Sequence, residues 1–331
     1  MKGSDPAKAH GSLELRIGLK RPMGSMVLCE TDLREPLSKA LHQFAICYLL
    51  FAICHHNIVV LRSMLSFTKM NGAGNDFVLV DNRSGRIRLN SDEIAFLCDR
   101  HRGVGGDGVL LLENPRNGAD FQMRYYNSDG GEAEMCGNGA RCFARFASKV
   151  AGPFSELTFE TPAGIIRAKL DGEQVTVNLS SPQGLALNRK LQIQGKELTV
   201  HLLNTGVPHV VVVVDDLEAT PVFELGKTIR YHPEFRPRGT NANFMKAIAP
   251  GKIAIRTYER GVEAETLACG TGVTASALIY SRLQSIDSPI RVQVRGGDWL
   301  EVAFVNAGQE FRDVALTGPA DFAFEGAIEL P

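Results

Sequence analysis

Two cysteines stand in the same short motif at distant points of the chain, Cys136 in CGNG and Cys269 in CGTG. Both motifs lead into an alanine-rich stretch with apolar residues about every 3.6 positions, which predicts a helix. The first N–H groups of a helix are unpaired and lie at the positive end of its dipole, so they favour a thiolate and can seat a carboxylate. The sequence therefore predicts two reactive thiols, each at the start of a helix.

Two such thiols facing one another would suit one reaction above others. A thiolate removes a proton from one face of a carbon, the opposing thiol returns a proton to the other face, and the carbon inverts. The glycines of the two motifs, at 137, 139, 270 and 272, let the backbone approach a ligand closely. An amino-acid α-proton is far less acidic than a thiol, so oriented donors must stabilise the carbanion. This chemistry needs neither a metal nor a cofactor.

The alternative reading is structural, because a single cysteine near a helix start is more often a small buried residue than a catalyst. Two cysteines at equivalent positions of a repeat favour catalysis instead. Cys98 and Cys142 have no such setting, and Cys142 is predicted to lie in the core. Asn138 and Thr271, just after the two cysteines, are predicted to cap the helices.

The chain repeats itself at an offset of 133 residues, which is the spacing of the two cysteines. Such self-similarity indicates a duplicated unit. The matching positions are Asn71 with Asn204, Phe77–Val80 with Val210–Val213, Gly106 with Gly239, Tyr125 with Tyr258, and Glu132 with Glu265. Short β-like runs occur at Val175–Leu179, Val210–Val214 and Val292–Val294. We therefore predict an α/β protein of two homologous lobes, residues 64–190 and 191–331, related by a pseudo-two-fold axis.

Residues 1–63 do not share this regularity and are interpreted as an extension outside the repeat. Their longest apolar run, Phe44–Cys54, has 11 residues, whereas a membrane-spanning helix needs about 20. Charged residues at 30–35 precede this run, which is unlike a signal peptide. A tag or translated upstream stretch is the favoured interpretation, and a targeting segment or a docked helix remain alternatives.

Composition excludes several classes of protein. Lys plus Arg total 36 against 37 for Asp plus Glu, and aromatic residues make up 7%, which argues against a nucleic-acid binder. The seven cysteines form no CxxC pair, so a disulfide scaffold or zinc ribbon is not expected and a reducing cytoplasm is. The segment Arg102–Gly108 (RGVGGDG) is only a weak hint of dinucleotide binding, because no strand–turn–helix pattern surrounds it.

From Met64 to its end the chain resembles the diaminopimelate epimerase family. The resemblance rests on FTKMNGAGNDFVLVD, RGVGGDG, YNSDGGEAEMCGNGARC, GVPHVV, GTNANFM and YERGVEAETLACGTG. It implies two α/β lobes, each a barrel-like sheet around a central helix, with the site in the cleft between them. It also implies cofactor-independent interconversion of LL- and meso-2,6-diaminopimelate, for lysine and peptidoglycan precursors, by a cytoplasmic homodimer that has no membrane or nucleic-acid partner.

The same resemblance implies roles for individual residues. Cys136 and Cys269 match the acid/base cysteines, and His209 and Glu259 match polar groups that support them. Positions matching substrate contacts are Asn75, Asn127, Asn241, Glu259 and Arg260, with Gly137, Asn138, Gly270 and Thr271 at the two helix starts. Three positions depart from some members of the family: Gly108 in place of Gln, Val207 in place of Asn, and Phe324 in place of a dimer-contact Tyr.

Other functions remain open at this point. A proline or hydroxyproline racemase, or an isomerase of the phenazine-biosynthesis type, would have the same double fold. Isomerases of the latter type generally lack the cysteine pair, and proline racemases have no use for Arg260, Glu259 and several asparagines. A catalytically silent diaminopimelate-binding protein or scaffold is the alternative from another class, and retention of both cysteines argues against it.

Overall fold

The structure is a computed structural model that describes residues 64–331, within the compact unit Arg62–Pro331. The predictions for residues 1–63, including the run Phe44–Cys54, lie outside the described residues. Within residues 64–331, no helix is long and apolar enough to cross a bilayer.

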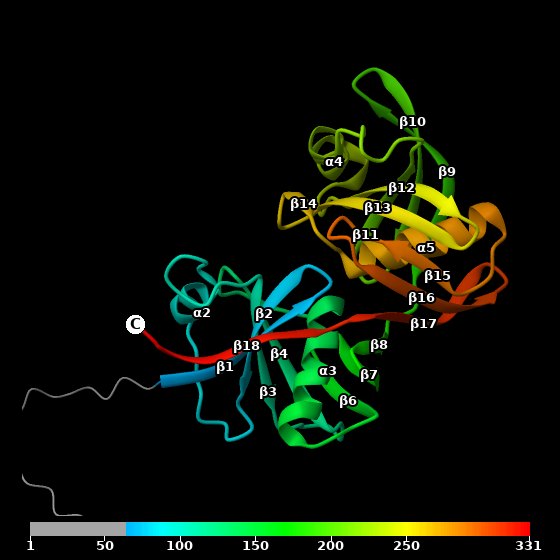
Figure 1. The fold of residues 1–331 in the computed structure, drawn as a ribbon. Coiled ribbons are helices and arrows are strands. Elements are labelled where there is room, and N and C mark those ends of the chain that lie inside the picture. Colours follow the sequence, from blue (N-terminus) through cyan, green and yellow to red (C-terminus); the bar gives the residue numbers. More distant parts are fainter. Residues whose placement is uncertain (1–63) are drawn as a thin grey trace, which may run out of the picture. The chain divides into compact units, whose positions relative to one another are not determined.

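The first lobe is a curved sheet around one long helix (Figure 1). Strand β1 pairs antiparallel with β2, β2 parallel with β3, β3 antiparallel with β4, and β4 parallel with β6, which continues through β7 to β8. The strands are β1 Met64–Gly72, β2 Asn75–Asp81, β3 Gly108–Glu113, β4 Phe121–Asn127, β5 Glu132–Ala133, β6 Glu156–Thr161, β7 Gly164–Asp171 and β8 Gln174–Asn178, and the helices are α2 Ser91–Cys98 and α3 Gly137–Ala151.

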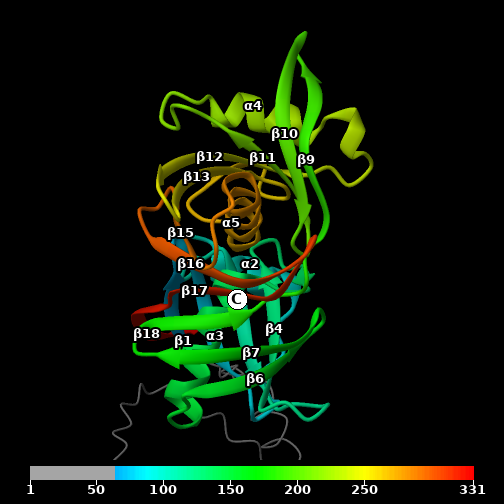
Figure 2. The same cartoon turned by 90° about the vertical axis from the view of Figure 1, so that its right-hand side faces the viewer.

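The second lobe repeats this plan, and Figure 2 shows its helix α5 end-on within a ring of strands. Strand β11 pairs parallel with β12, and β13 pairs antiparallel with β12 and parallel with β15. The strands are β9 Gln183–Ile193, β10 Lys196–Asn204, β11 Pro208–Val213, β12 Asn241–Ala249, β13 Lys252–Glu259, β14 Ala264–Thr266, β15 Ile290–Gln293, β16 Trp299–Ala307, β17 Glu310–Pro319 and β18 Asp321–Glu329. The helices are α4 Val222–Arg230, the 3₁₀ helix η1 Pro233–Phe235 and α5 Gly270–Gln284.

The predicted repeat and fold class are confirmed. Helices α3 and α5 both have 15 residues and begin at Gly137 and Gly270, which are 270 − 137 = 133 positions apart. The matched runs Phe77–Val80 and Val210–Val213 lie in β2 and β11, and each of these strands has a parallel neighbour, β3 or β12. Each lobe thus wraps its sheet around a helix that a cysteine precedes.

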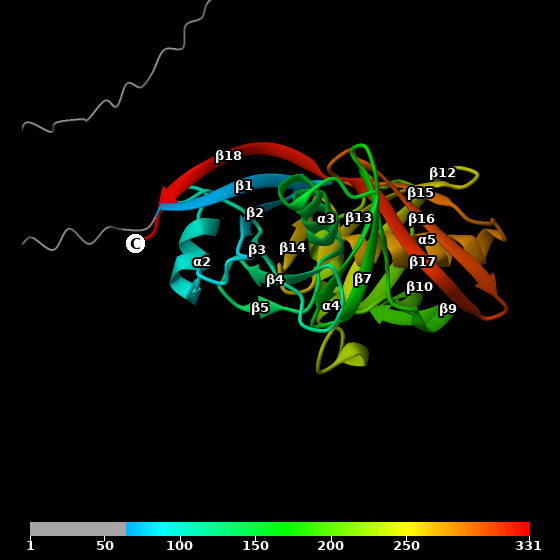
Figure 3. The same cartoon turned by 90° about the horizontal axis from the view of Figure 1, so that it is seen from below.

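The last two strands tie the lobes together. Strand β17 pairs with β16 of the second lobe and with β8 of the first, while β18 lies along β1 (Figure 3). The predicted division at residues 190 and 191 falls within β9. The domain limits therefore stay a prediction, but the C-terminal strands clearly complete the sheet of the first lobe.

Apolar packing fixes the direction of each central helix. Phe143 and Phe146 of α3 are buried, and the Phe143 ring packs on Phe159 of β6 with 4.8 Å between ring centroids. Cys142 is fully buried in the same cluster, as predicted for a core cysteine. Because the apolar face locks the helix against its sheet, the N-terminal end of the helix has a fixed position.

Candidate active site

Cys136 and Cys269 are the N-cap residues of α3 and α5. Both have extended backbones, with φ and ψ of −134° and 122° at Cys136 and −126° and 106° at Cys269. The prediction that Asn138 and Thr271 cap the helices is wrong, since both residues lie inside the first turn. No side chain caps either helix, and the N–H groups of Asn138 and Gly139 lie close enough to the Cys136 sulfur to stabilise its thiolate form.

The starts of the two helices meet. A Cβ atom added to Gly270 would lie 3.8 Å from the Cα of Gly137 and 3.4 Å from Oδ1 of Asn138. Any side chain at 270 would therefore occupy the space between the two helix ends. These glycines bring two sets of free N–H groups to one place, where an anionic ligand would be stabilised from both sides.

A cavity of about 370 Å³ lies at this meeting point. Of the residues predicted for the site, it is lined by Asn75, Asn127, Cys136, Gly137, Asn138, Asn241, Glu259, Arg260, Cys269, Gly270 and Thr271. Only His209 is missing from the lining. Hollows of about 570 and 630 Å³ occur elsewhere on residues 64–331, but no cysteine lines either of them, so chemistry and not size identifies the site.

The thiols differ from the sequence prediction in their acidity. Burial raises the pKa of both Cys136 and Cys269 above the ordinary value for a thiol, and the negative charge of Glu259 raises both further. N–H donors oppose this shift, from Gly139 to Cys136 and from Gly272 to Cys269, but they do not overcome it. The N–H groups at each helix start thus offset only part of the rise in thiol pKa that burial causes. Both thiols are therefore protonated in the unliganded site.

Glu259 places a carboxylate beside the second thiol, that of Cys269. Its carboxylate accepts a hydrogen bond from the hydroxyl of Thr266, at 3.0 Å, and its charge acts on the thiol of Cys269, whose own hydrogen bond, of 3.5 Å, is with the hydroxyl of Thr271. Burial nevertheless raises the pKa of Glu259 above its usual value, and the charge of Asp107 adds to this. A more basic carboxylate next to a thiol is a better acceptor of the thiol's proton.

His209 is buried beside the site and stays neutral. Asn243 donates to Nδ1 of His209 at 3.2 Å, and its amide is fixed by a second bond to the carbonyl of Val210 and by the hydroxyl of Thr257. Burial, followed by the charge of Arg260, lowers the pKa of His209 to about 3. Within residues 64–331 its Nε2 has no partner, and no hydrogen bond joins it to a cysteine. Support of a cysteine by His209 stays a prediction.

Arg260 presents an unpaired guanidinium at the cavity. Its backbone N–H donates to Oδ1 of Asn241 at 2.8 Å, and its side chain donates only to the carbonyl of Arg238, at 3.4 Å. In the described part of the chain it forms no ion pair with Asp or Glu. It is therefore available to a carboxylate, which a guanidinium binds with two parallel hydrogen bonds.

Tyr125 lines the cavity, although the sequence indicated it only as a position of the repeat and not as a site residue. A Cβ added to Gly108 would lie 2.6 Å from Cε2 of Tyr125, so the tyrosine ring fills the space beside the glycine. The ring is buried and packs edge-on against Phe77, and its hydroxyl has no hydrogen-bond partner among residues 64–331. The departure at Gly108 is thus accompanied by a neighbour that brings a polar group to the cavity.

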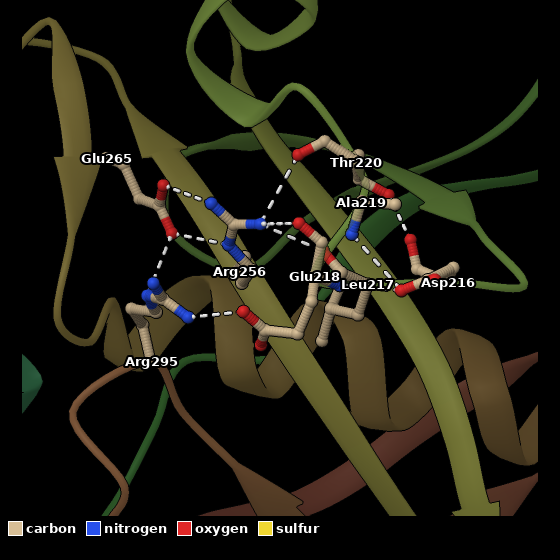
Figure 4. Close-up of polar contacts among 8 residues, drawn as sticks. All are labelled: Asp216, Leu217, Glu218, Ala219, Thr220, Arg256, Glu265 and Arg295. Carbon is tan, nitrogen blue, oxygen red and sulfur yellow. Dashed lines mark hydrogen bonds and ion pairs between the residues drawn. The ribbon is translucent and has the colours of Figure 1, made fainter.

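Figure 4 shows the ion pairs of Arg256 and Arg295 with Glu218 and Glu265. Strands β13 and β14, which Arg256 and Glu265 join, also carry Glu259 and Thr266. Arg256 of β13 donates two bonds of 2.7 Å to Glu265 of β14 and also binds the carbonyls of Leu217, Glu218 and Thr220. Arg295 reaches Glu218 at 2.8 Å. In the first lobe, Arg124 and Glu132 make an equivalent pair, with two bonds of 3.0 Å. Both cysteines are therefore preceded by a hairpin with an arginine–glutamate bridge.

We expect Arg256→Met to lower the free energy of unfolding by about 3 kcal/mol, because it leaves a largely buried Glu265 and several carbonyls without their donor. Arg295→Met is the matched control, since that side chain is 42% exposed, its close partner Glu218 is 73% exposed, and its contact with Glu265 is longer, at 3.7 Å. Its cost should stay below about 1 kcal/mol. Urea denaturation of both variants checks this, and equal losses would contradict it.

Within residues 64–331, no group of three or more His, Cys, Asp and Glu side chains could hold a metal ion.

Comparison with known proteins agrees on one family. The family profile for diaminopimelate epimerase matches residues 67–184 and 201–323. The chain is 42% identical over 276 residues to the diaminopimelate epimerase of Aquifex aeolicus, covering 80% of this chain and 98% of that protein. The enzyme of Herminiimonas arsenicoxydans is 41% identical over 287 residues, with 80% and 99% covered.

Solved structures show the same fold at low identity. A hydroxyproline epimerase from Agrobacterium vitis has a TM-score of 0.63 and 17% identity, covering 80% of this chain and 91% of that one. A phenazine biosynthesis protein of Bacillus anthracis also has a TM-score of 0.63, with 16% identity, covering 80% and 99%. These likenesses concern the fold alone, whereas the sequence matches extend across both lobes and both cysteine motifs. The chain belongs to the diaminopimelate epimerase family.

Proposed function

We propose that this protein interconverts LL- and meso-2,6-diaminopimelate by proton transfer between Cys136 and Cys269. One observation carries the proposal: two free cysteines cap two helices whose N-terminal ends meet at a single cavity. A carboxylate at the helix ends would hold the adjacent carbon between the two sulfurs. Family membership supports the same substrate.

The proton balance of the reaction is simple. The Cα–H bond breaks as one thiolate takes its proton, and a new Cα–H bond forms on the opposite face with the proton of the other thiol. Because both thiols are protonated in the unliganded site, one must first lose its proton. Glu259 is the acceptor for Cys269, since both line the cavity, the charge of Glu259 acts on the thiol, and the pKa of the carboxylate is raised.

The charged and polar groups of the cavity suit a substrate that carries an ammonium and a carboxylate group at each end. The N–H groups at Gly137–Asn138 and Gly270–Thr271 receive the carboxylate of the reacting centre. Arg260 binds the distant carboxylate, while Glu259 and the carbonyls of Asn127 and Asn241 accept ammonium groups. A proline racemase would leave Arg260 at the cavity without an anion, so its free guanidinium favours diaminopimelate over proline.

Solvent-proton exchange tests the proposal. In D₂O the enzyme should label the α-carbon of diaminopimelate, detected by mass spectrometry, together with conversion of LL to meso on a chiral column. Proline and hydroxyproline should stay unlabelled. Labelling of proline would identify a racemase, and binding of diaminopimelate without any exchange would identify a silent binding protein.

The active form is a homodimer in the cytoplasm. Four cysteines at 98, 136, 142 and 269 are free thiols, as in a reducing compartment. In the described part of the chain, β18 pairs through one edge only, with β1, and Phe324 on it is 51% exposed. Light scattering should give twice the chain mass of 36.0 kDa.

A further inference from the structure

Arg141 is a buried cation whose position the reaction scheme does not explain. It is fully buried in the first lobe, one turn into α3, and within residues 64–331 it forms no ion pair with an acidic side chain. Its guanidinium instead donates to the carbonyls of Gly72 at 3.3 Å, Gly137 at 3.4 Å and Pro319 at 3.2 Å. A buried charge without an ion-pair partner is costly, so Arg141 depends on the hydrogen-bond acceptors around it.

The fourth bond of Arg141 leads toward the cavity. Its guanidinium donates to Oδ1 of Asn138 at 3.0 Å, and Nδ2 of Asn138 donates to Oδ1 of Asn75 at 2.6 Å. Nδ2 of Asn75 in turn donates to Oδ2 of Asp107 at 2.8 Å. Four side chains therefore form one hydrogen-bonded row, and its two middle members line the cavity.

The far end of the row lies in RGVGGDG, the segment that the sequence associated only weakly with dinucleotides. Asp107 also accepts the backbone N–H of Asp76 at 3.2 Å and a bond from Arg100 at 3.0 Å. Arg100 makes two further bonds to Asp76, and Lys69 pairs with Asp76 at 2.8 Å. Asp107 is thus held in place from three sides.

The charged residues at the two ends of the row, Asp107 and Arg141, determine which way each amide between them is oriented. An ionised aspartate only accepts hydrogen bonds and a guanidinium only donates them. If the amide of Asn75 turned over, its oxygen would face the Asp107 carboxylate; if that of Asn138 turned over, its NH₂ group would face Arg141. Neither amide can reverse, and each keeps one unused N–H for the cavity.

We propose that Asp107 and Arg141 are positioning residues that fix the amide orientation of Asn75 and Asn138 for the substrate. The proposal rests on the function proposed above and adds two residues that do not themselves line the cavity. A ligand then meets preset donors and does not have to order the two amides on binding.

A double-mutant cycle on Asp107 and Asn75 tests the acceptor end. Asp107→Asn keeps the shape but can donate as well as accept, so it removes the directional constraint. We expect KM for diaminopimelate to rise about tenfold, with a smaller change in kcat. In the Asn75→Ala background the same substitution should change KM by less than about twofold. An unchanged KM, or an equal increase in both backgrounds, would overturn the proposal.

The matched control is Asp81→Asn, at the end of β2 and outside the cavity. Asp81 also accepts two bonds from an arginine, Arg83, so it tests the loss of a paired carboxylate as such. Its KM should equal that of the unmodified enzyme. Arg141→Lys with Asn138→Ala forms a second cycle for the donor end; if that variant does not fold, the Asp107 cycle decides alone.

Failure of the proposed function would look different. If the unmodified enzyme does not turn over diaminopimelate, the same Asp107–Asn75 cycle is measured in the free energy of unfolding, because the row exists without a ligand. If the effects of the two substitutions on the free energy of unfolding are coupled, the proposal that Asp107 positions Asn75 is retained. If the effects are strictly additive, it is rejected.

Discussion

Cys136→Ala and Cys269→Ala each abolish net epimerisation, with an expected loss of kcat of roughly 10³-fold or more. Each face of the substrate carbon has its own sulfur at its own helix start, and the remaining cysteine serves only the face that it lies on. The measurement is conversion of LL- to meso-diaminopimelate on a chiral column, combined with deuterium incorporation from D₂O. Conversion of LL to meso and the deuterium incorporation that accompanies this conversion should both be lost.

Cys98→Ala and Cys142→Ala are the matched controls. Both cysteines are free and buried, but neither lines the cavity. These variants should retain turnover and lose only the stability that accompanies a small buried volume. Undiminished turnover in either Cys136→Ala or Cys269→Ala would contradict the two-cysteine mechanism.

The sequence could predict the centre of the site because its signals are local. The helical period after Cys136 and Cys269 and the glycines beside them follow from residues within a few positions, and the repeat follows from comparing the chain with itself. Both helices occur where expected, as do the strands at Val175, Val210 and Val292. A sulfur at a helix start is thus visible without a structure.

The acidity of the thiols could not be predicted, because it depends on what the fold places around them. The helix start alone suggests a lowered pKa, but burial and the charge of Glu259 reverse the direction. Asn138 does not cap α3 because Cys136 is the N-cap residue and Asn138 already lies in the first turn. The amide of Asn138 bonds instead to Asn75, which lies 63 residues earlier in the chain.

The residues that escaped sequence reasoning act across long separations. Tyr125 reaches the cavity because β4 pairs with β3 at Gly108, and Arg141 joins α3 to a carbonyl 178 residues away. The sequence gives no signal for the latter, because Arg141, Arg145 and Lys149 recur every four positions, a spacing typical of an exposed basic face.

Glu259→Gln should separate thiol reactivity from turnover. The carboxylate raises the pKa of Cys136 and Cys269 through its charge, so its removal lowers both, and more thiolate is present at pH 7. Alkylation of Cys269 by iodoacetamide should therefore become faster. Turnover should fall roughly 10²- to 10⁴-fold, because an amide cannot accept the proton of Cys269.

Thr266→Val is the control for this prediction, since it removes the 3.0 Å hydrogen bond to Glu259 and keeps the charge. That bond lowers the pKa of Glu259, so its loss makes the carboxylate more basic still. Proton acceptance then remains possible, and turnover should change by less than about tenfold. Mass spectrometry of alkylated peptides between pH 6 and pH 10, alongside the chiral assay, reads both effects. If Glu259→Gln slowed alkylation, or left turnover intact, the carboxylate would not be the acceptor for Cys269, and the reaction would need another route for that proton.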